Sequence, residues 1–375
     1  MKIVYLIAGT FNSGGMERVL ANKTNWLARH GHEVTVVTTD QRGRVPYFPM
    51  DKRIGHYDLG INYDENNGSL LRKCLQFPMK QRRHRRQLEM LLREIGPDVT
   101  VCMFNNDVSF VHGMNDGSKK ILEVHFSKNK KLQYARKGIW HLADRWRTRQ
   151  DEKLVRKYDR FVVLTHEDKR LWGDLPNMSV IPNALTPHPS LLTSHPSPLT
   201  SHTVLAIGRY DYQKGFDTLL DIWHSLGDQK DGWTLDIIGD GPLRATLQQQ
   251  VEQLGLQESV RLLPPTNHIH TAYQEASIFV MTSRYEGLPM VLLEAQAHGL
   301  PIVAFACQCG PRDVITDSMD GFLIENRDEE RFAKCLLRLI NGEKLRQEMG
   351  AKAIEASQRF DEETIMRKWE QLFLS

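Results

Sequence analysis

Short apolar segments of strand length alternate with helical stretches along most of the chain, and they do so in two series. The first series contains IVYLIA, EVTVVTTD, DVTVCM, KKILEVHF and RFVVLT, and the second contains TVLAIGR, WTLDIIG, SVRLLP, SIFVMTS and PIVAFA. Apolar strands that alternate with helices are typical of parallel sheets covered on both faces. The pattern therefore predicts the α/β class, with two open Rossmann-like sheets.

A segment of different composition separates the two series. Residues 186–202, TPHPSLLTSHPSPLTSH, are rich in Ser, Thr, Pro and His, and HPSLLTS is nearly repeated as HPSPLTS. Because so few apolar residues cannot form a core, a flexible linker explains the segment better than a metal site made by its histidines. We expect an N-terminal domain over residues 1–185, a linker over 186–202 and a C-terminal domain over 203–359.

Charge is distributed unevenly between the two halves. Residues 1–185 hold 32 Lys and Arg against 20 Asp and Glu, whereas the rest of the chain holds 17 against 26. No apolar run approaches the roughly 20 residues of a membrane span, and the first strand is too short for a signal peptide. The five cysteines form no zinc pattern. We expect a cytoplasmic protein with reduced thiols, associated at most with a membrane surface.

The segment SRYEGLPMVLLEAQAHG combines two acidic residues with a helix that is apolar nearly all round. Glu286 follows the strand SIFVMTS, and Glu294 lies inside the helix. A buried carboxylate is costly unless it is hydrogen-bonded, so Glu294 is expected to have a specific partner, either a ligand or another side chain. The start of this helix, from Gly287 to Met290, presents backbone N–H groups that favour an anion such as a diphosphate, although a Gly before a helix is often only a turn.

Two cations precede the first helix of the second series. Arg209 ends the strand TVLAIGR, and Lys214 follows five residues later. At the carboxyl end of a strand, the two side chains could neutralise the charge of a nucleoside-diphosphate leaving group, a task for which other transferases use a metal ion. The chain has no Asp-x-Asp sequence, and we expect neither a metal nor a cofactor. A pair of solvated surface cations is the simpler alternative.

Glycines and a histidine mark other strand ends. Gly14 and Gly15 follow the first strand and open a helix, where backbone N–H groups can face a phosphate. Their spacing differs from the G-x-G-x-x-G motif of dinucleotide-binding domains, so the sequence does not favour a dehydrogenase. Gly239, in IIGDGP, is either part of a tight turn or a nucleoside contact. His125 ends KKILEVHF and is either structural or part of a site.

Taken together, these motifs resemble those of the retaining GT-B glycosyltransferases of family four, and among them the capsule and exopolysaccharide sugar transferases. The resemblance spans nearly the whole chain. It rests on GGMER, on R-x4-K-G at Arg209, on E-x7-E at Glu286, and on GPRDVI with its continuation DGFLI. It implies two Rossmann-like domains that face each other across a cleft, with a final helix within residues 360–375 that packs back on the first domain.

The resemblance also implies roles for individual residues. Glu286 would contact donor-sugar hydroxyls, Glu294 would hold the ribose, and Arg209 and Lys214 would grip the diphosphate. Gly14 and Gly15 would approach the donor and the acceptor from the first domain, and His125 would lie near the reacting sugar. The diphosphate grip would be completed by the backbone of Gly287, Leu288, Pro289, Met290 and Val291. The implied reaction is substitution on one face of the sugar, with no enzyme nucleophile and no metal.

The acceptor and two rival functions remain open. The basic stretch KQRRHRR, with Lys80, Arg82, Arg83, Arg85 and Arg86, lies between apolar stretches and suits an anionic membrane surface, although a solvated helix face would look the same. No nucleic-acid motif accompanies it. We therefore expect a saccharide or lipid-linked saccharide acceptor. The rivals are a sugar-nucleotide epimerase and a non-catalytic sugar-nucleotide-binding protein.

Overall fold

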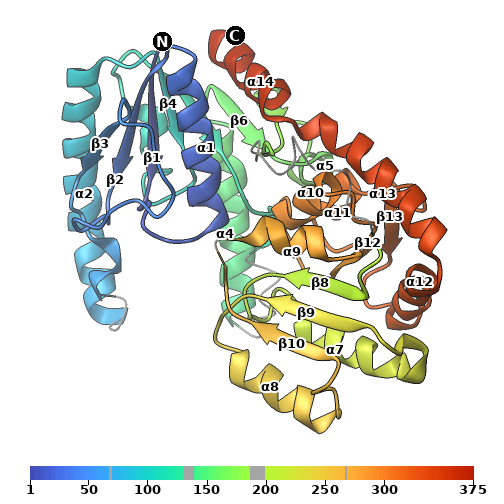
Figure 1. Ribbon diagram of the computed structural model, residues 1–375. Helices are drawn as coiled ribbons and strands as arrows, with labels where there is room; N and C mark the ends of the chain where they lie inside the picture. Colours follow the sequence, from blue (N-terminus) through green and yellow to red (C-terminus); the bar gives the residue numbers. More distant parts are fainter. Residues whose placement is uncertain (67–69, 131–138, 186–198, 267) are drawn as a thin grey trace. The chain divides into compact units, whose positions relative to one another are not determined.

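The computed structural model describes residues 1–66, 70–130, 139–185, 199–266 and 268–375. The chain divides into two compact units, one of Met1–Pro182 with Met366–Ser375 and the other of Asn183–Ile365. Each unit is built on a parallel sheet with helices on both faces (Figure 1). The α/β class with two Rossmann-like domains is thereby confirmed. Of the expected linker, residues 186–198 lie outside the described residues.

The first unit contains a seven-stranded sheet in the order β3-β2-β1-β4-β5-β6-β7. β1 lies at its centre, where Ile3 pairs with Val34 of β2 and Val99 of β4. The strands are β1 Lys2–Ile7, β2 Glu33–Thr38, β3 Gly55–Asp58, β4 Val99–Cys102, β5 Lys119–Glu123, β6 Arg160–Val163 and β7 Met178–Val180. The helices are α1 Gly15–Arg29, α2 Leu70–Ile95, α4 Ile139–Val155 and α5 His166–Trp172, with the short helices η1 Tyr63–Asn66 and η2 Val111–Gly113.

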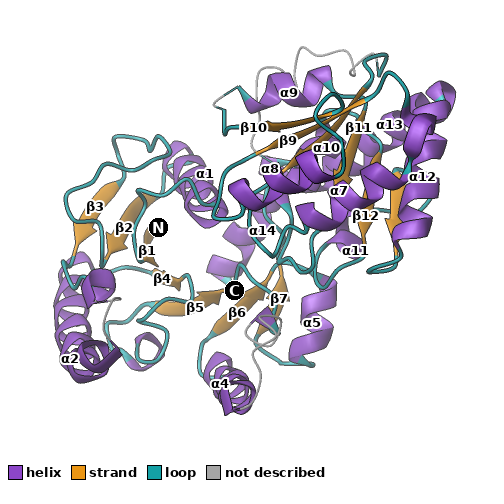
Figure 2. Cartoon of the chain, turned by 90° about the horizontal axis from the view of Figure 1, so that it is seen from below, coloured by secondary structure: helices purple, strands orange, loops and turns teal. Residues whose placement is uncertain are grey.

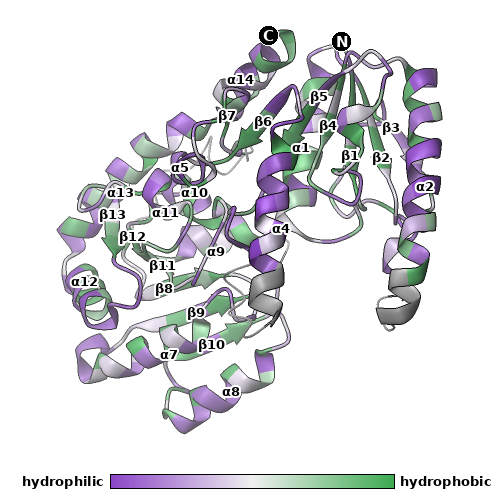
Figure 3. Ribbon diagram, turned by 180° about the vertical axis from the view of Figure 1, so that it is seen from behind, coloured by the Kyte–Doolittle hydropathy of each residue, from purple (hydrophilic) through white to green (hydrophobic). Residues whose placement is uncertain are grey.

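Alternate residues of the first sheet face different helices. Val4 and Leu6 of β1 belong to a buried cluster with Leu88 and Leu92 of α2, as the period of two in a strand requires. Figure 2 shows α1 and the end of α14, Glu362–Leu374, over one face of the sheet, with α2 and α4 on the other. Because both faces are covered, the central strands are apolar nearly throughout and are the most hydrophobic parts of the unit (Figure 3).

The second unit contains a six-stranded sheet in the order β10-β9-β8-β11-β12-β13. Its strands are β8 Thr203–Ile207, β9 Thr234–Ile238, β10 Val260–Leu263, β11 Ile278–Met281, β12 Ile302–Phe305 and β13 Gly321–Ile324. Its helices are α7 Phe216–Ser225, α8 Arg244–Gln253, α9 Ile269–Glu275, α10 Met290–Ala297, α11 Pro311–Val314, α12 Glu329–Asn341 and α13 Glu343–Ser357, with η3 Gly227–Lys230 and η4 Gln358–Phe360.

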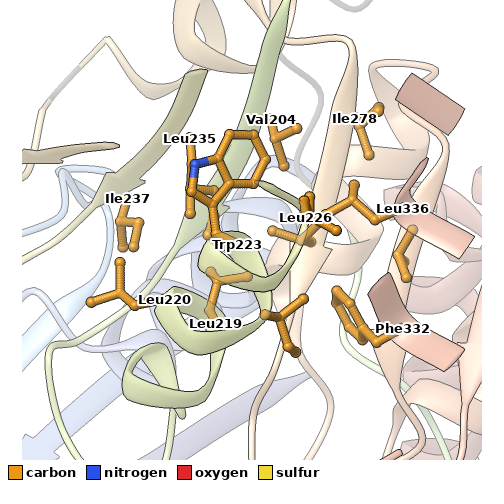
Figure 4. Close-up of a cluster of buried hydrophobic side chains, with 14 of the residues drawn as sticks. Val204, Leu219, Leu220, Trp223, Leu226, Leu235, Ile237, Ile278, Phe332 and Leu336 are labelled. Atoms are coloured by element: carbon orange, nitrogen blue, oxygen red, sulfur yellow. The ribbon is translucent and has the colours of Figure 1, made fainter. Parts of the chain in front are cut away.

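A hydrophobic core of the second unit lies between its sheet and the helices α7, α8 and α12. Trp223 of α7 is fully buried against strand residues that include Val204 and Leu235, and Phe332 of α12 belongs to the same cluster (Figure 4). Phe279 of β11 points to the other face, where its ring lies near that of Tyr273 of α9. This packing holds the carboxyl ends of the strands, from which the loops described below begin.

The last helix, α14, begins in the second unit and ends in the first. Trp369 is fully buried, and Lys119 donates a hydrogen bond from Nζ to the carbonyl oxygen of Phe373 at 2.8 Å. The residues Met366–Ser375 are therefore part of the first domain although they end the chain.

Candidate functional site

The carboxyl ends of the second sheet bring together loops that are far apart in sequence. β8 and β11 are neighbours in this parallel sheet, so the loop that contains Arg209 and Lys214 lies beside the loop that contains Glu286. The backbone N–H of Arg284 donates to the carbonyl oxygen of Gln213 at 2.7 Å and ties the two loops together. In open α/β sheets, ligands bind at this edge.

Lys214 and Glu286 form an ion pair at this edge. Lys214 Nζ donates to Glu286 Oε1 at 2.7 Å, and the side chains are 19% and 7% exposed. Gln213 Nε2 donates to the other carboxylate oxygen at 3.2 Å. Burial by itself lowers the pKa of Lys214, but the neighbouring carboxylate outweighs burial and raises it. The ammonium of Lys214 is therefore held charged against the Glu286 carboxylate, with little exposure to solvent.

Arg209 occupies a different environment from Lys214. Its side chain is 71% exposed, and its closest acidic neighbour is Asp211, whose Oδ2 lies 3.8 Å from Nε. Such an exposed pair contributes little to stability. The two predicted cations thus differ, because Lys214 is largely buried and paired with Glu286, whereas Arg209 is directed to solvent.

The helix that follows Glu286 is buried, as its sequence predicts. α10 begins at Met290, and Pro289 is the residue that precedes its first turn. Its start is closely packed, because a Cβ atom on Gly310 would lie 2.5 Å from Pro289 Cδ and 2.7 Å from the carbonyl oxygen of Gly287. Only glycine fits there, also because the φ angle of Gly310 is +104°. Leu288 and Pro289 are buried, while Gly287, Met290 and Val291 are partly exposed.

Glu294 is buried in the middle of α10 and has the specific partner that its sequence environment predicts. The hydroxyl of Tyr273, from α9, donates to Glu294 Oε2 at 2.7 Å. Tyr273 is itself fully buried and stacks on His298, with the ring centroids 4.9 Å apart. The orientation of the carboxylate is therefore fixed from within the second domain.

Gly239 is packed too closely for any side chain. A Cβ atom there would lie 1.9 Å from the carbonyl oxygen of Gly208. This close contact between the ends of β9 and β8 explains why residue 239 is a glycine, and no ligand is needed for that explanation. A nucleoside contact at Gly239 remains a proposal.

The first domain places Gly14 and Gly15 where α1 begins. A Cβ atom on Gly14 would lie 2.2 Å from the Glu17 carboxylate, whereas a Cβ atom on Gly15 would have no neighbour within 4 Å. Gly14 precedes the helix without a side-chain cap. The first backbone N–H groups of the helix are thus the kind of group that binds an anion.

His125 lies just beyond β5 and contacts a buried acidic residue. Its Nε2 is 3.0 Å from Glu123 Oε1, and the side chains are 8% and 0% exposed. Lys23 of α1 donates to the same carboxylate oxygen. Burial alone would raise the pKa of Glu123, but the charges of Lys23 and His125 lower it to about 2. Burial lowers the pKa of Lys23.

The basic stretch lies on α2, and one of its residues must be corrected. Arg82, Arg83, Arg85 and Arg86 are exposed. Lys80 is only 16% exposed, because its ammonium donates to the carbonyl oxygen of Asn62 and lies 3.7 Å from a carboxylate oxygen of Glu65. Lys80 is therefore not part of the exposed basic surface.

Two kinds of candidate are absent from the described part of the chain. No described group of three or more His, Cys, Asp or Glu side chains is arranged to hold a metal ion. None of the helices within the described ranges combines the length and the apolar character that a bilayer-spanning segment requires.

Comparison with known proteins identifies the family. Residues 13–188 match the family model described as Glycosyltransferase Family 4, and residues 190–356 match Glycosyl transferases group 1. An uncharacterised glycosyltransferase of Haemophilus influenzae is 31% identical over 370 residues, with 98% of each chain covered. The chain belongs to the family-four glycosyltransferases.

Further matches agree with this assignment. The glycosyltransferase is 29% identical over 374 residues to the amylovoran biosynthesis glycosyltransferase AmsD of Erwinia amylovora, with 98% of each chain covered. It is similar in fold to the crystal structure of TarM from S. aureus, with a TM-score of 0.81 at 19% identity over 100% of each chain. Its two Rossmann-like domains are those of the GT-B fold.

Several residues of these networks are not predicted from the sequence of the glycosyltransferase. Gln213 contacts Glu286, Tyr273 holds Glu294, and Glu123, which is paired with Lys23, lies beside His125. Gln213 precedes Lys214 and could have been suggested by its position in R-x4-K-G. Glu123 is also signalled, because it is an acidic residue within the apolar run of residues 121–124. Tyr273 carries no comparable signal.

Proposed function

We propose that this glycosyltransferase moves a sugar from a nucleotide sugar, with UDP as the expected nucleotide, to a saccharide or lipid-linked saccharide in surface polysaccharide synthesis, and that it retains the anomeric configuration. The observation that carries the proposal is the largely buried pair of Lys214 and Glu286 at the carboxyl edge of the second sheet. The pair supports the proposal because a cation suited to a diphosphate lies beside a carboxylate suited to sugar hydroxyls.

In this proposal, Lys214 and Arg209 stabilise the departing diphosphate. Negative charge develops on the phosphate oxygen as its bond to the sugar C1 breaks, and fixed cations stabilise that charge most where water is excluded. Lys214 suits this task because it is largely buried and remains charged. Arg209 is exposed and free to approach the second phosphate. The backbone N–H groups at the start of α10 complete the site, and no metal ion is required.

The two glutamates have different tasks. Glu286 accepts hydrogen bonds from donor-sugar hydroxyls while it remains beside Lys214. Glu294, held by Tyr273, accepts hydrogen bonds from the ribose. The acceptor hydroxyl then forms its bond to C1 on the face from which the diphosphate leaves, and its proton passes to the leaving phosphate oxygen. Bonds and charge balance without a covalent enzyme intermediate.

The first domain is proposed to hold the acceptor. Gly14 and Gly15 would approach the donor and the acceptor, and His125 would contact the reacting sugar, as the family resemblance implies. The expected location is the cytoplasmic side of a membrane. A stripe on α2 supports docking there, because residues 75, 79, 82, 83, 86 and 90 share one helix face and are exposed leucine, methionine and arginine.

The relatives support the choice of donor and pathway. The TarM structure contains UDP together with alpha-GlcNAc-glycerol, and AmsD is named for amylovoran biosynthesis. Both names agree with the resemblance to capsule and exopolysaccharide transferases.

Proton NMR of nucleotide sugars, with and without a lipid-linked acceptor, tests the proposal. We expect each donor to remain unchanged alone, and one donor to lose its sugar to the acceptor with the anomeric coupling of the donor kept in the product. Conversion of a nucleotide sugar alone into its epimer would instead establish an epimerase. Binding without turnover, with every acceptor tried, would indicate a non-catalytic binding protein.

A further inference from the structure

The first domain contains a buried charged network that the mechanism above does not use. Glu123, at the end of β5, is fully buried and pairs with Lys23, whose side chain is 3% exposed. The Lys23 ammonium also lies 3.7 Å from the centroid of the Trp369 ring. Three segments, α1, β5 and the end of α14, thus meet at one carboxylate.

Stability alone does not account for such a network. Moving two charges out of water costs free energy that their attraction only partly returns, and apolar residues of similar volume are often as stable or more so. The site is closed to solvent, because Lys23, Glu123 and Trp369 are all buried. The ion pair of Lys23 and Glu123 therefore indicates a role other than stabilisation of the fold.

The contact of Glu123 with His125 indicates what that task is. His125 Nε2 is 3.0 Å from the same carboxylate oxygen that accepts from Lys23, an ion-pair distance at which the ring N–H is not aligned for a hydrogen bond. A carboxylate fixed beside one ring nitrogen favours a proton on that nitrogen and one orientation of the ring. Lys23 in turn fixes the carboxylate, because the ammonium is confined between Glu123 and the Trp369 ring.

We propose that Glu123 and Lys23 are positioning residues for His125, which keep Nε2 protonated toward Glu123 and leave Nδ1 for the substrate. The inference rests on the proposed function, in which His125 contacts the reacting sugar. It adds that α1 and the end of α14 take part in orienting that histidine through Lys23 and Trp369.

Two double variants separate orientation from stability. In K23M/E123L the buried pair becomes apolar at similar size, and His125 loses the polar oxygen beside Nε2. In K23M/E123Q the pair is also neutral, but an amide oxygen still lies beside Nε2. We expect kcat to fall about 100-fold in the first variant, since a small misplacement of a reacting group has an effect of that size. The donor KM should change less than about threefold, and the second variant should recover at least about tenfold in kcat.

The controls distinguish this inference from the proposed function. If H125A is inactive while K23M/E123L retains wild-type kcat, the positioning role is wrong and the role of His125 stands. If H125A retains full activity, the assigned role of His125 fails, and the positioning inference fails with it. Equal losses in the two double variants, both folded, would show that a polar oxygen beside Nε2 does not matter and would also overturn the inference.

A measurement on the wild-type protein serves if the double variants do not fold. Long-range ¹H–¹⁵N correlation spectra of histidine-labelled protein, assigned with H125A, report which ring nitrogen is protonated. The inference predicts a protonated Nε2. A neutral ring protonated at Nδ1 alone would contradict it.

Discussion

Lys214 donates from Nζ to Glu286 Oε1 at 2.7 Å, although the two residues are 72 positions apart and follow different strands. The pair forms because β8 and β11 are neighbours in the sheet and their loops leave it at the same edge. In the absence of substrate, each charge neutralises the other. A diphosphate must therefore compete with Glu286 for the ammonium, and this competition gives the first prediction.

Replacement of Glu286 by Gln should have opposite effects on nucleotide binding and on turnover. Because the ammonium is released from its carboxylate, we expect the affinity for UDP to rise about threefold to tenfold. Turnover should fall at least about 100-fold, since the hydroxyl contact that orients the sugar is weakened. Isothermal titration with UDP and kinetics with the identified donor measure the two effects.

A matched control uses another glutamate of the same domain. Glu325 pairs with Arg312 and is 75% exposed, so E325Q should change neither property and should alter stability by less than about 0.5 kcal/mol. Weaker UDP binding by E286Q, with E325Q unchanged, would show that the carboxylate assists the diphosphate directly and would contradict the competition.

Two glycine variants should separate contact with substrate from packing. Gly15→Ala is expected to fold normally, because the added methyl group meets nothing within 4 Å, while kcat/KM falls if a substrate approaches this backbone. Gly239→Ala should destabilise the second domain by about 2 kcal/mol or more, because its Cβ would lie 1.9 Å from a carbonyl oxygen. Thermal unfolding and steady-state kinetics report both. A fully active G15A enzyme would remove Gly15 from the proposed site.

Much of the fold could be predicted from the sequence, and the exceptions have a physical reason. The central strands are apolar because both faces of each sheet are covered, and such short apolar runs are recognisable in the sequence. The edge strand β3, GHYD, was missed because it is mostly exposed and polar. β7 was missed because it has only three residues.

For the candidate site, the sequence predicts the residues but not their contacts. Glu286, Lys214 and Glu294 were recognisable from their places next to strands and in a buried helix. Their contacts were not, because a contact depends on which loops the sheet order brings together. Tyr273 and Lys23 show this most clearly, since each meets its carboxylate across at least 21 positions of sequence.

Removal of the exposed arginines of α2 should weaken binding to anionic membranes. Each basic residue near such a surface contributes about 1 kcal/mol, so R82Q/R83Q/R86Q should bind phosphatidylserine vesicles about 100-fold more weakly at low salt. The control K334Q/K344Q/K352Q removes the same charge from side chains that are 70%, 89% and 55% exposed on the second domain. Co-sedimentation measures both variants. Equal losses would indicate an effect of net charge and would remove the specific role of α2.

His84 should make the first domain sensitive to acid. It is buried in α2, its Nδ1 is 3.1 Å from the Tyr63 hydroxyl, and burial lowers its pKa to about 4. Because the folded pKa lies below the unfolded value, its contribution is complete above pH 6.5 and is lost as pH falls toward 4. Relative to wild type, His84→Asn should therefore gain about 3 kcal/mol of unfolding free energy between pH 7.5 and 4. Urea unfolding at both pH values checks this, and a constant difference between the two proteins would contradict it.

Release of nucleotide from a panel of UDP- and GDP-sugars, with and without a lipid-linked acceptor, tests the central claim most directly. It should be followed in wild type, Glu286→Ala and the control Glu325→Ala. We predict that one nucleotide is released, that its release depends on the acceptor, and that Glu286→Ala abolishes it while Glu325→Ala does not. Acceptor-dependent release that survives in Glu286→Ala would contradict the assignment of the donor-sugar site to Lys214 and Glu286.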